Sequence, residues 1–465
     1  MLESDKKIDL EGQDAIDLWL KGKDSWNAWV KENPVADVDF YDMDFSEYRD
    51  HPFIKNDEWP FSGFAFPTGA VSFIGTSFGK GDVHFSGVSF GDGEVSFFGS
   101  SFGNGYISFY ETSFGDGQVD FSSTTFGDGG VSFHDTSFGD GDVSFFGSSF
   151  GDGDVIFEFA SFGKGEVDFN RTLFGKGEVS FGGTLFGDGL VNFCGVSFGE
   201  GHVNFWKSSF GDGAVHFESV DFEGRVDFSD LENVSAVKNF TFAHSTFQNS
   251  LSISSDEPFG CVVDLTSTKM SNQVSLAGLQ CSLRKTKAFL GSEWLGKAKA
   301  LNVRDIERFR RLKEIAGNNK DHEQALYFNV MEMQAKRWHK TTIAGLFFEF
   351  VFQASSNYGR SEIRAFLWMV FVCAACSRAY LYWSDTMKDQ LCEPSGKMWA
   401  SITFSIGQML SFVPISRTAR IDGAKCLFRL EQLPVEVVLL AFAQSLISII
   451  LIFLIGLSLR NRFKV

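Results

Sequence analysis

Acidic residues recur within glycine-rich turns of this 465-residue chain, in a pattern that could hold calcium. The stretch "GDGD" at Gly139–Asp142 is one of many such turns. Carboxylate oxygens are the ligands that Ca²⁺ prefers, and stacked rows of Asp hold the ion between the turns of some repeat proteins. The Asp is not kept in every copy, because the equivalent positions include Lys80, Asn104, Lys164, Lys176 and Glu200. We therefore expect solvated turn acids and no metal site.

Other residues that could do chemistry also lie inside the repeats. "GTSFGKG" at Gly75–Gly81 is one residue short of a phosphate-binding loop, and Gly81 stands where Ser or Thr would hold magnesium. Four histidines occupy alternate, outward positions without partners in register: His84, His134, His202 and His216. The sequence has no serine-hydrolase elbow, zinc-protease motif or Cys–His pair of meaningful spacing. We expect no catalytic residues, no enzyme activity and no cofactor.

These turns belong to a twelve-residue repeat that accounts for much of the chain's 55 Phe and 48 Gly. Fourteen units start between Trp59 and Val215, and only the last is one residue short. Apart from the first unit, which begins at Trp59, and the one that begins at Ile107, each has Val at position one. Phe follows at three, a small residue at six in all but the first unit, and Phe at eight. This alternation places the apolar side chains of each pair on one face of a short strand. Two turn residues, often ending in a glycine such as Gly75, separate the pairs. We expect the glycines of "GDG" to supply positive φ angles.

Two short strands and two turns, repeated in register, predict a β-solenoid whose stacked coils bury a ladder of Phe rings. The ladder extends with less regular units on both sides of the perfect copies, from Val38 to Cys281. Residues representative of the buried ladder are Val83, Phe85, Val88, Phe90, Phe97, Phe102, Phe145, Phe150, Phe205 and Phe210.

The spacing resembles that of the pentapeptide-repeat family, which places a large residue at the centre of each five-residue side and a small residue two before it. "TSF" at Thr76–Phe78, five residues after Phe73, follows that rule. The opening "LWLKGKDSWNAWVKENP" also looks like the helical lead-in of membrane-linked members. The resemblance implies a right-handed quadrilateral β-helix. Every second side is two residues longer here, so a square coil needs twenty-four residues. A flat twelve-residue coil is the rival, and we favour the square one because four Phe rings fill its lumen more easily.

Composition divides the chain into four segments. We expect a helical lead-in over 1–37, a solenoid over 38–283 with regular repeats at 59–225, a helical hairpin over 284–342 and a membrane region over 343–465. In the hairpin, Ile306, Phe309, Leu312 and Ile315 form one apolar stripe, Gly317 is a stop signal, and Asp321 is a candidate cap for the second helix.

Two stretches of the last segment are long and apolar enough to span a bilayer, at 365–383 and 437–459. Arg378 lies near the end of the first span, where its side chain can reach the headgroups. The stretch 343–353 is too short to span, and we expect it along the bilayer surface. The basic ending "RNRFKV" indicates a cytoplasmic C-terminus. With two spans the solenoid is then cytoplasmic too, in agreement with the charged start of the chain and with thiols suited to a reducing compartment.

The segment between the spans has features of a channel. The apolar stretch 398–413 is too short for an easy crossing and lies where a two-helix cation channel has its pore helix; some membrane-linked pentapeptide-repeat proteins resemble such channels. The following "SFVPISRTARIDG" lacks the carbonyl-lined filter of potassium channels. Gln444 and Ser445 could line a pore or bond a neighbouring helix. The candidate membrane or pore residues are Arg378, Gln408, Gln444 and Ser445. Cys392 and Cys426 could form a disulfide or be two separate thiols.

The formal net charge is −18, and residues 71–228 hold 23 acidic against 6 basic residues, a net −17. So acidic a surface repels phosphate backbones, and we expect no nucleic-acid partner. The favoured interpretation is a solenoid scaffold or sensor, anchored in a bacterial inner membrane, that binds a protein partner and forms a homo-oligomer. The alternative is an oligomeric pore regulated by the solenoid. A third, weaker possibility is imitation of DNA, as proposed for soluble members that bind topoisomerase.

Overall fold

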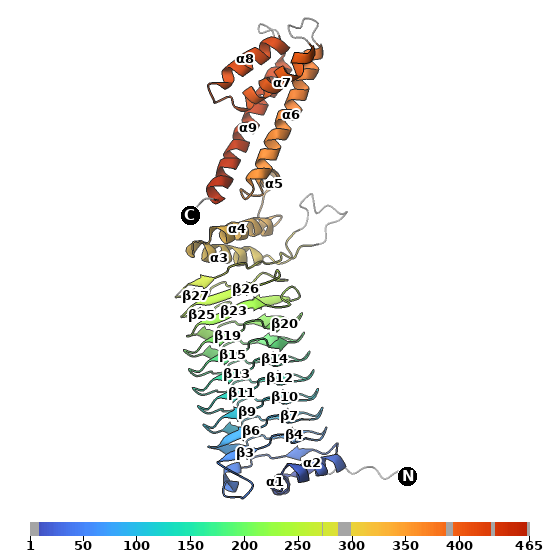
Figure 1. The fold of residues 1–465 in the computed structure, drawn as a ribbon, viewed down its shortest axis with the longest axis vertical. Helices are drawn as coiled ribbons and strands as arrows, with labels where there is room; N and C mark the ends of the chain where they lie inside the picture. Colours follow the sequence, from blue (N-terminus) through green and yellow to red (C-terminus); the bar gives the residue numbers. More distant parts are fainter. Residues whose placement is uncertain (1–8, 272, 287–298, 387–393, 429–432, 463–465) are drawn as a thin grey trace, which may run out of the picture. The chain divides into compact units, whose positions relative to one another are not determined.

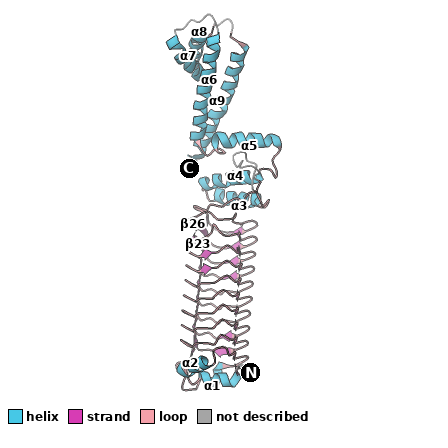
Figure 2. Ribbon diagram, turned by 90° about the vertical axis from the view of Figure 1, so that its right-hand side faces the viewer, coloured by secondary structure: helices cyan, strands magenta, loops and turns pink. Residues whose placement is uncertain are grey.

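The computed structural model describes residues 9–271, 273–286, 299–386, 394–428 and 433–462, which form two compact units. The solenoid unit comprises 1–286 and 300–335, and the helical unit comprises 287–299 and 336–465. The solenoid unit is a stack of coils with helices at both of its ends (Figure 1). It is drawn mostly as loop in Figure 2, because most of its strands are only two or three residues long.

Two long parallel sheets form opposite sides of the stack, each of ten strands. In chain order, sheet one contains β1 (Leu10–Glu11), β2 (Val38–Asp39), β4 (Val71–Ser72), β7 (Val95–Ser96), β10 (Val119–Asp120), β12 (Val143–Ser144), β14 (Val167–Asp168), β17 (Val191–Asn192), β21 (Ala214–His216) and β24 (Asn239–Thr241). Sheet two contains β3 (Glu58–Pro60), β6 (Asp82–His84), β9 (Ile107–Ser108), β11 (Val131–Ser132), β13 (Val155–Ile156), β15 (Val179–Ser180), β19 (Val203–Asn204), β23 (Val226–Leu231), β26 (Leu251–Ser255) and β28 (Val274–Ser275).

The two remaining sides are built from isolated bridges and shorter sheets. These short sheets pair β5 (Ser77–Gly79) with β8 (Ser101–Phe102), β16 (Leu185–Phe186) with β20 (Ser209–Phe210), and β18 (Ser197–Phe198), β22 (Asp221–Phe222), β25 (Thr246–Phe247) and β27 (Lys269–Met270) in one row. A 3₁₀ helix, η1, covers Phe45–Tyr48.

The register fixes the coil at twenty-four residues. Val95 pairs with Val119, and Val119 pairs with Val143, in parallel alignment. This confirms the square coil over the flat twelve-residue one. Ten strands stacked at about 4.8 Å give a rise of roughly 43 Å. The ladder also reaches further towards the N-terminus than residue 38, because Leu10 pairs with Val38.

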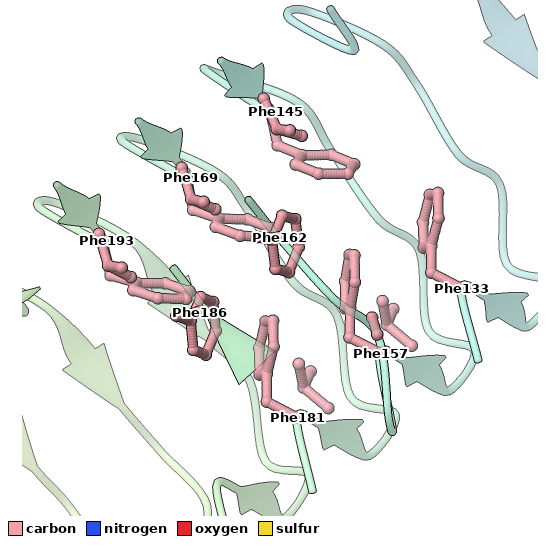
Figure 3. Close-up of a cluster of buried hydrophobic side chains, with 14 of the residues drawn as sticks. Phe133, Phe145, Phe157, Phe162, Phe169, Phe181, Phe186 and Phe193 are labelled. Atoms are coloured by element: carbon pink, nitrogen blue, oxygen red, sulfur yellow. The ribbon is translucent and has the colours of Figure 1, made fainter. Parts of the chain in front are cut away.

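Phenylalanine rings fill the lumen in columns (Figure 3). Phe145, Phe169 and Phe193 stack on one another with centroids 4.7 Å apart and planes within 4° of parallel. Rings from the facing column meet them edge to face, as Phe157 meets Phe145 at 5.5 Å and 89°. Both arrangements suit the ring quadrupole. All ten residues predicted for the buried ladder are at most 3 % exposed.

The small residue at position six joins neighbouring coils. The hydroxyl of Thr124 donates to the carbonyl of Phe97 at 2.7 Å, and Thr136 donates in the same way to Phe109. Both threonines are fully buried, so the bond satisfies a hydroxyl and a carbonyl that water cannot reach. The sequence indicated only that this position must be small.

The expectation about the "GDG" glycines is wrong. Among the described turns, positive φ occurs at Gly79 and Gly139 but not at most other "GDG" glycines. Their role is close stacking: a Cβ on Gly141 would lie 2.1 Å from the carbonyl oxygen of Gly117, one coil earlier. The left-handed position is instead the two-residue turn between the pairs, where Gly147 has a φ of +62°.

Helices close both ends of the stack. At the start, α1 (Gly12–Trp19) and α2 (Lys23–Glu32) place Trp19 on Phe61 and Trp26 on Phe40, with near-parallel rings at 5.1 and 6.0 Å. Each buried indole therefore continues a Phe column by one layer, and the first coil does not expose its aromatic face.

At the other end, the predicted hairpin is α3 (Asp305–Asn318) and α4 (His322–Lys336). Arg308 binds Asp264 at 2.7 Å, and Arg311 donates to the carbonyl of Thr268 at 3.0 Å. The predicted apolar stripe of α3 is buried in the same core as the Phe columns. Asp321 accepts from the Gln324 amide at 3.0 Å, as expected of an N-cap.

The helical unit contains α5 (Ile343–Ser356), α6 (Glu362–Thr386), α7 (Pro394–Met409), α8 (Ser416–Leu427) and α9 (Val435–Arg462). Helices α6 and α9 pack on each other, and α7 contacts α6, α8 and α9. Two of the described helices, α6 and α9, are long and apolar enough to cross a membrane. They enclose the two predicted spans. Helix α7 begins before the apolar stretch predicted at 398–413 and ends inside it.

Candidate functional site

The carboxylates of the glycine turns have a structural role in the solenoid. Oδ1 of Asp92 accepts the backbone N–H of Asp116, and Oδ1 of Asp116 accepts that of Asp140, at 3.3 and 3.1 Å. Each carboxylate thus satisfies an amide of the following coil. Further along this column Lys164 forms an ion pair with Asp140, which lowers the pKa of that carboxyl. In the part of the chain that the structure describes, no group of three or more His, Cys, Asp or Glu could hold a metal ion.

The four histidines lie on different coils, where two of them have carboxylate neighbours. His134 Nδ1 is 3.0 Å from Asp135 Oδ2, and His202 Nδ1 is 3.5 Å from Glu178 Oε1. His84 and His216 are half-buried on sheet strands of opposite sides. His202 and Glu178 are twenty-four residues apart, so the expectation that the histidines have no partners in register is wrong for His202.

An exposed aromatic column runs along the turns that follow sheet-two strands. We define it as Tyr110, His134, Phe159 and Trp206. The Tyr110 and His134 centroids are 5.6 Å apart, and so are those of His134 and Phe159. Trp206 occupies the same turn two coils beyond that of Phe159. Tyr110, Phe159 and Trp206 are 40 %, 56 % and 43 % exposed, whereas the Phe rings that point into the lumen are almost completely buried.

The column cannot be recognised when the repeats are aligned in units of twelve residues, even though a coil of twenty-four was favoured. Within a twelve-residue unit these side chains look like unrelated surface variation. The twenty-four-residue register supplies the signal, since it places residues 110, 134, 158 and 206 in one row. On the opposite side the corresponding row contains Phe98 and Phe146, but Ser122 lies between them.

In the helical unit, the two residues predicted either to line a pore or to bond a neighbouring helix form hydrogen bonds between helices. Gln444 on α9 is 1 % exposed; it accepts from Tyr380 on α6 at 2.8 Å and donates to Ser405 Oγ on α7 at 2.7 Å. Ser405 in turn donates to the Cys373 carbonyl of α6 at 3.0 Å. Ser445 donates to the carbonyl of Gln408 at 2.9 Å. Gln444 and Ser445 therefore join the helices of one chain.

Arg378 and Gln408 line two separate hollows. Arg378 is exposed at a groove of about 600 Å³ between α6 and α7, and no hydrogen bond or ion pair joins it to another described residue. Gln408 lines a hollow of about 430 Å³ among α7, α8 and α9, together with Arg417 and Arg420. Both hollows have mostly apolar walls.

A buried hydrogen-bond cluster ties the start of the helical unit to α5. Arg337 donates to Gln353 at 2.7 Å and to the Tyr358 hydroxyl at 2.6 Å, and lies 3.3 Å from Glu349. Tyr358 donates to Glu349 at 3.0 Å, and burial raises the pKa of Tyr358 above its usual value. Glu349, a charged residue within an apolar helix, is thereby compensated.

The cysteines divide between the two units. Cys194, Cys261 and Cys281 of the solenoid are free thiols, and burial raises the pKa of both Cys261 and Cys281 to about 12. Cys426, between the two long apolar helices, is disulfide-bonded. Its predicted partner Cys392 lies outside the described residues, so that pairing stays a prediction.

Apolar side chains cover the outside of the helical unit. Only 22 % of the apolar window of α6, and 22 % of that of α9, is buried inside the chain. Phe366 and Leu367 on α6, and Leu439, Phe442 and Phe453 on α9, are all more than half exposed. Soluble monomers rarely expose a continuous apolar surface of this extent. No protein-family model matches this chain, and no curated protein sequence matches it.

Proposed function

We propose that this protein is a membrane-anchored interaction scaffold or sensor without catalytic activity. The observation that carries the proposal is the contrast in exposure: α6 and α9 leave most of their apolar surface uncovered, whereas the solenoid buries its own core. A bilayer covers the apolar surface of α6 and α9, and the solenoid presents a regular acidic face to a partner protein. The pentapeptide-repeat family supplies an architectural parallel, since its coils also carry one large and one small residue per side.

The proposed location is a bacterial inner membrane, with the solenoid and the C-terminus in the cytoplasm. Two spans return the chain to the side from which it entered. The basic residues Arg460 and Arg462 at the end of α9 favour a cytoplasmic end. Free thiols in the solenoid and a disulfide-bonded Cys426 between the spans agree with a reducing side and an oxidising side.

The experiment is a pull-down from gently solubilised membranes, comparing the full chain with a variant that lacks residues 59–225. We expect a protein partner that the full chain retains and the variant loses. Equal recovery of every protein by both chains would contradict a scaffold role for the solenoid.

An oligomeric pore is the second candidate, and the short helix α7 between the two spans favours it. Helix α7 has 16 residues, about 24 Å of helix, and packs against both α6 and α9. Because the side-chain amide of Gln444 is hydrogen-bonded to Tyr380 and Ser405 of the same chain, a pore would have to form between copies of the protein. Chemical crosslinking in liposomes tests for homo-oligomers, and single-channel recording then separates a pore from an anchor.

A further inference from the structure

The aromatic column is not explained by the folding of the solenoid. Phe159 has a φ of +57°, in the left-handed region that disfavours bulky side chains. The same turn position is glycine in other coils of that side, among them those of Gly87 and Gly183. It is Glu111, Asp135 and Lys207 in further coils, also with positive φ. Phe159 is therefore the bulky apolar residue of this row. The Phe columns inside the lumen are complete without it. An exposed ring at a strained backbone position lowers stability, so its presence indicates a role outside folding.

Glycine also makes room for this ring. A Cβ on Gly183 would lie 2.7 Å from Cε1 of Phe159, so the ring rests on the glycine of the next coil. The adjacent Gly182 has no positive φ, and a Cβ there would meet only ordinary contacts, the nearest at 3.5 Å. Gly182 and Gly183 therefore leave the turn between those of Phe159 and Trp206 without side chains, whereas the equivalent turns of other coils carry them. We call this turn the bare step.

Carboxylates accompany the rings. Glu111, Asp135 and Glu158 belong to the same turns as Tyr110, His134 and Phe159. Glu111 raises the pKa of the Tyr110 hydroxyl, through a side-chain hydrogen bond first and through its charge second. The Glu158 carboxylate accepts from Ser180 at 2.7 Å, which holds it beside the bare step. The solenoid behind them is strongly acidic, so anions are repelled from this face.

Aromatic faces next to carboxylates suit one class of side chain in particular. A guanidinium lies flat on an aromatic ring and also pairs with a carboxylate, whereas an ammonium does both less well. A cation of the chain already contacts one ring, since the Lys207 ammonium lies 4.6 Å from the centroid of Trp206. An arginine over Trp206 would take the place of this ammonium.

We propose that the aromatic column and its three carboxylates form the docking site for an arginine-containing, extended segment of a partner protein. The column covers four coil steps, about 19 Å at about 4.8 Å per step, which matches roughly six residues of extended chain. The arginines lie over Tyr110, Phe159 and Trp206 and pair with Glu111, Asp135 and Glu158. This deepens the scaffold function proposed above and depends on it.

The test uses the full chain in lipid nanodiscs and a fluorescent peptide of seven residues, with Arg at positions one, four and seven and Ser elsewhere. This spacing of about 10 Å between arginines matches the two-coil spacing of the rings. Binding is followed by fluorescence anisotropy. A citrulline peptide of the same length lacks the charge but keeps the shape. We expect the Arg peptide to bind, the citrulline peptide to bind at least tenfold more weakly, and a Lys peptide to lie between them. No binding of the Arg peptide at physiological ionic strength would overturn the proposal.

Matched variants separate the column from general acidity. Tyr110→Ala, Phe159→Ala and Trp206→Ala combined should weaken the Arg peptide about tenfold or more. Phe98→Ala with Phe146→Ala, which removes exposed rings from the opposite side, should change its affinity less than twofold. Because all five side chains are exposed, both variants should melt like the parent protein. Equal affinities of the two variants would overturn the proposal, even if both still bind.

A third variant tests the charges. Glu111→Gln, Asp135→Asn and Glu158→Gln combined should lower Arg-peptide affinity while leaving the rings in place, and unchanged affinity would overturn their assigned part. The pull-down decides the proposed function separately. A partner retained by the full chain and by the aromatic variant would leave the scaffold intact and overturn only the docking site.

Discussion

The solenoid unit buries its apolar side chains within itself, whereas the helical unit leaves most of its apolar surface exposed. The solenoid turns its Val and Phe side chains into a closed lumen, and its ends are covered by Trp19, Trp26 and α3. The helical unit has a small buried cluster around Tyr380, Phe404 and Phe428, held by a few polar ties, and leaves most of α6 and α9 exposed.

The difference shows what each unit needs from its surroundings. A stack of coils with capped ends needs nothing further to be stable in water. Two apolar helices need an apolar solvent, which a bilayer provides, and in that solvent hydrogen bonds such as those of Gln444 become the specific contacts between helices. We therefore expect core changes to act strongly on the solenoid and single polar changes to act weakly on the helical unit.

The largest effect should follow from emptying a Phe column. Phe145→Ser should lower the free energy of unfolding by at least about 3 kcal/mol, because a fully buried ring is lost from a close-packed stack and a hydroxyl takes its place. The measurement is thermal unfolding of the purified chain, followed by the strand signal in circular dichroism. Phe146→Ser is the matched control, since the neighbouring ring is 41 % exposed. If both variants melted together, the lumen would not be the source of stability.

A smaller effect should distinguish the two kinds of glycine. Gly141→Ala should cost about 2–3 kcal/mol, because the new methyl group would collide with the backbone of the preceding coil. Gly147→Ala should cost about 1 kcal/mol, because it has free space but a left-handed φ. Chemical denaturation of both variants measures the difference. The reverse order would show that the left-handed turn at Gly147, and not the close stacking at Gly141, is the stricter requirement for glycine.

In the helical unit, Gln444→Leu should cost about 1 kcal/mol, since it removes the ties to Tyr380 and Ser405 in an apolar setting. Unfolding of the full chain in mixed detergent micelles measures this, with Leu446→Ala as an exposed control on the same helix. A loss as large as that of Phe145→Ser would show that α7 is held chiefly by Gln444, and the contrast between the units would fail.

The smallest effect is expected at position six of the repeat. Thr124→Val should cost no more than about 1 kcal/mol, because it loses one hydrogen bond to Phe97 but keeps the volume. The chain itself places Val at 88, 196 and 220, all buried. Denaturation of Thr124→Val beside Thr124→Ser measures the hydroxyl's share. A cost comparable to the Phe change would mean that the hydroxyl rows, and not the rings, align the coils.

Much of the fold follows from local spacing, and the remainder depends on contacts between coils. Val and Phe at two-residue intervals predicted the strands, and the length of apolar runs predicted α6 and α9. The real reason for Gly141 could not be inferred, because it is the distance to a backbone oxygen twenty-four residues earlier. The role of Trp19 and Trp26 was equally hidden, since a helix that covers the end of a Phe column looks in sequence like any amphipathic helix. The aromatic column required the coil length first: Phe159 lies one position away from the row of Tyr110 and His134 and joins it only through ring contact.

Alkaline carbonate extraction of bacterial membranes that contain the full chain tests the central contrast most directly. High pH strips proteins bound only through surface charges and leaves those held by apolar spans. The account predicts that the full chain stays in the membrane pellet while its solenoid remains protease-resistant from β1 to β28. Release of the intact chain into the supernatant would contradict it, because α6 and α9 would then be covered by something other than lipid.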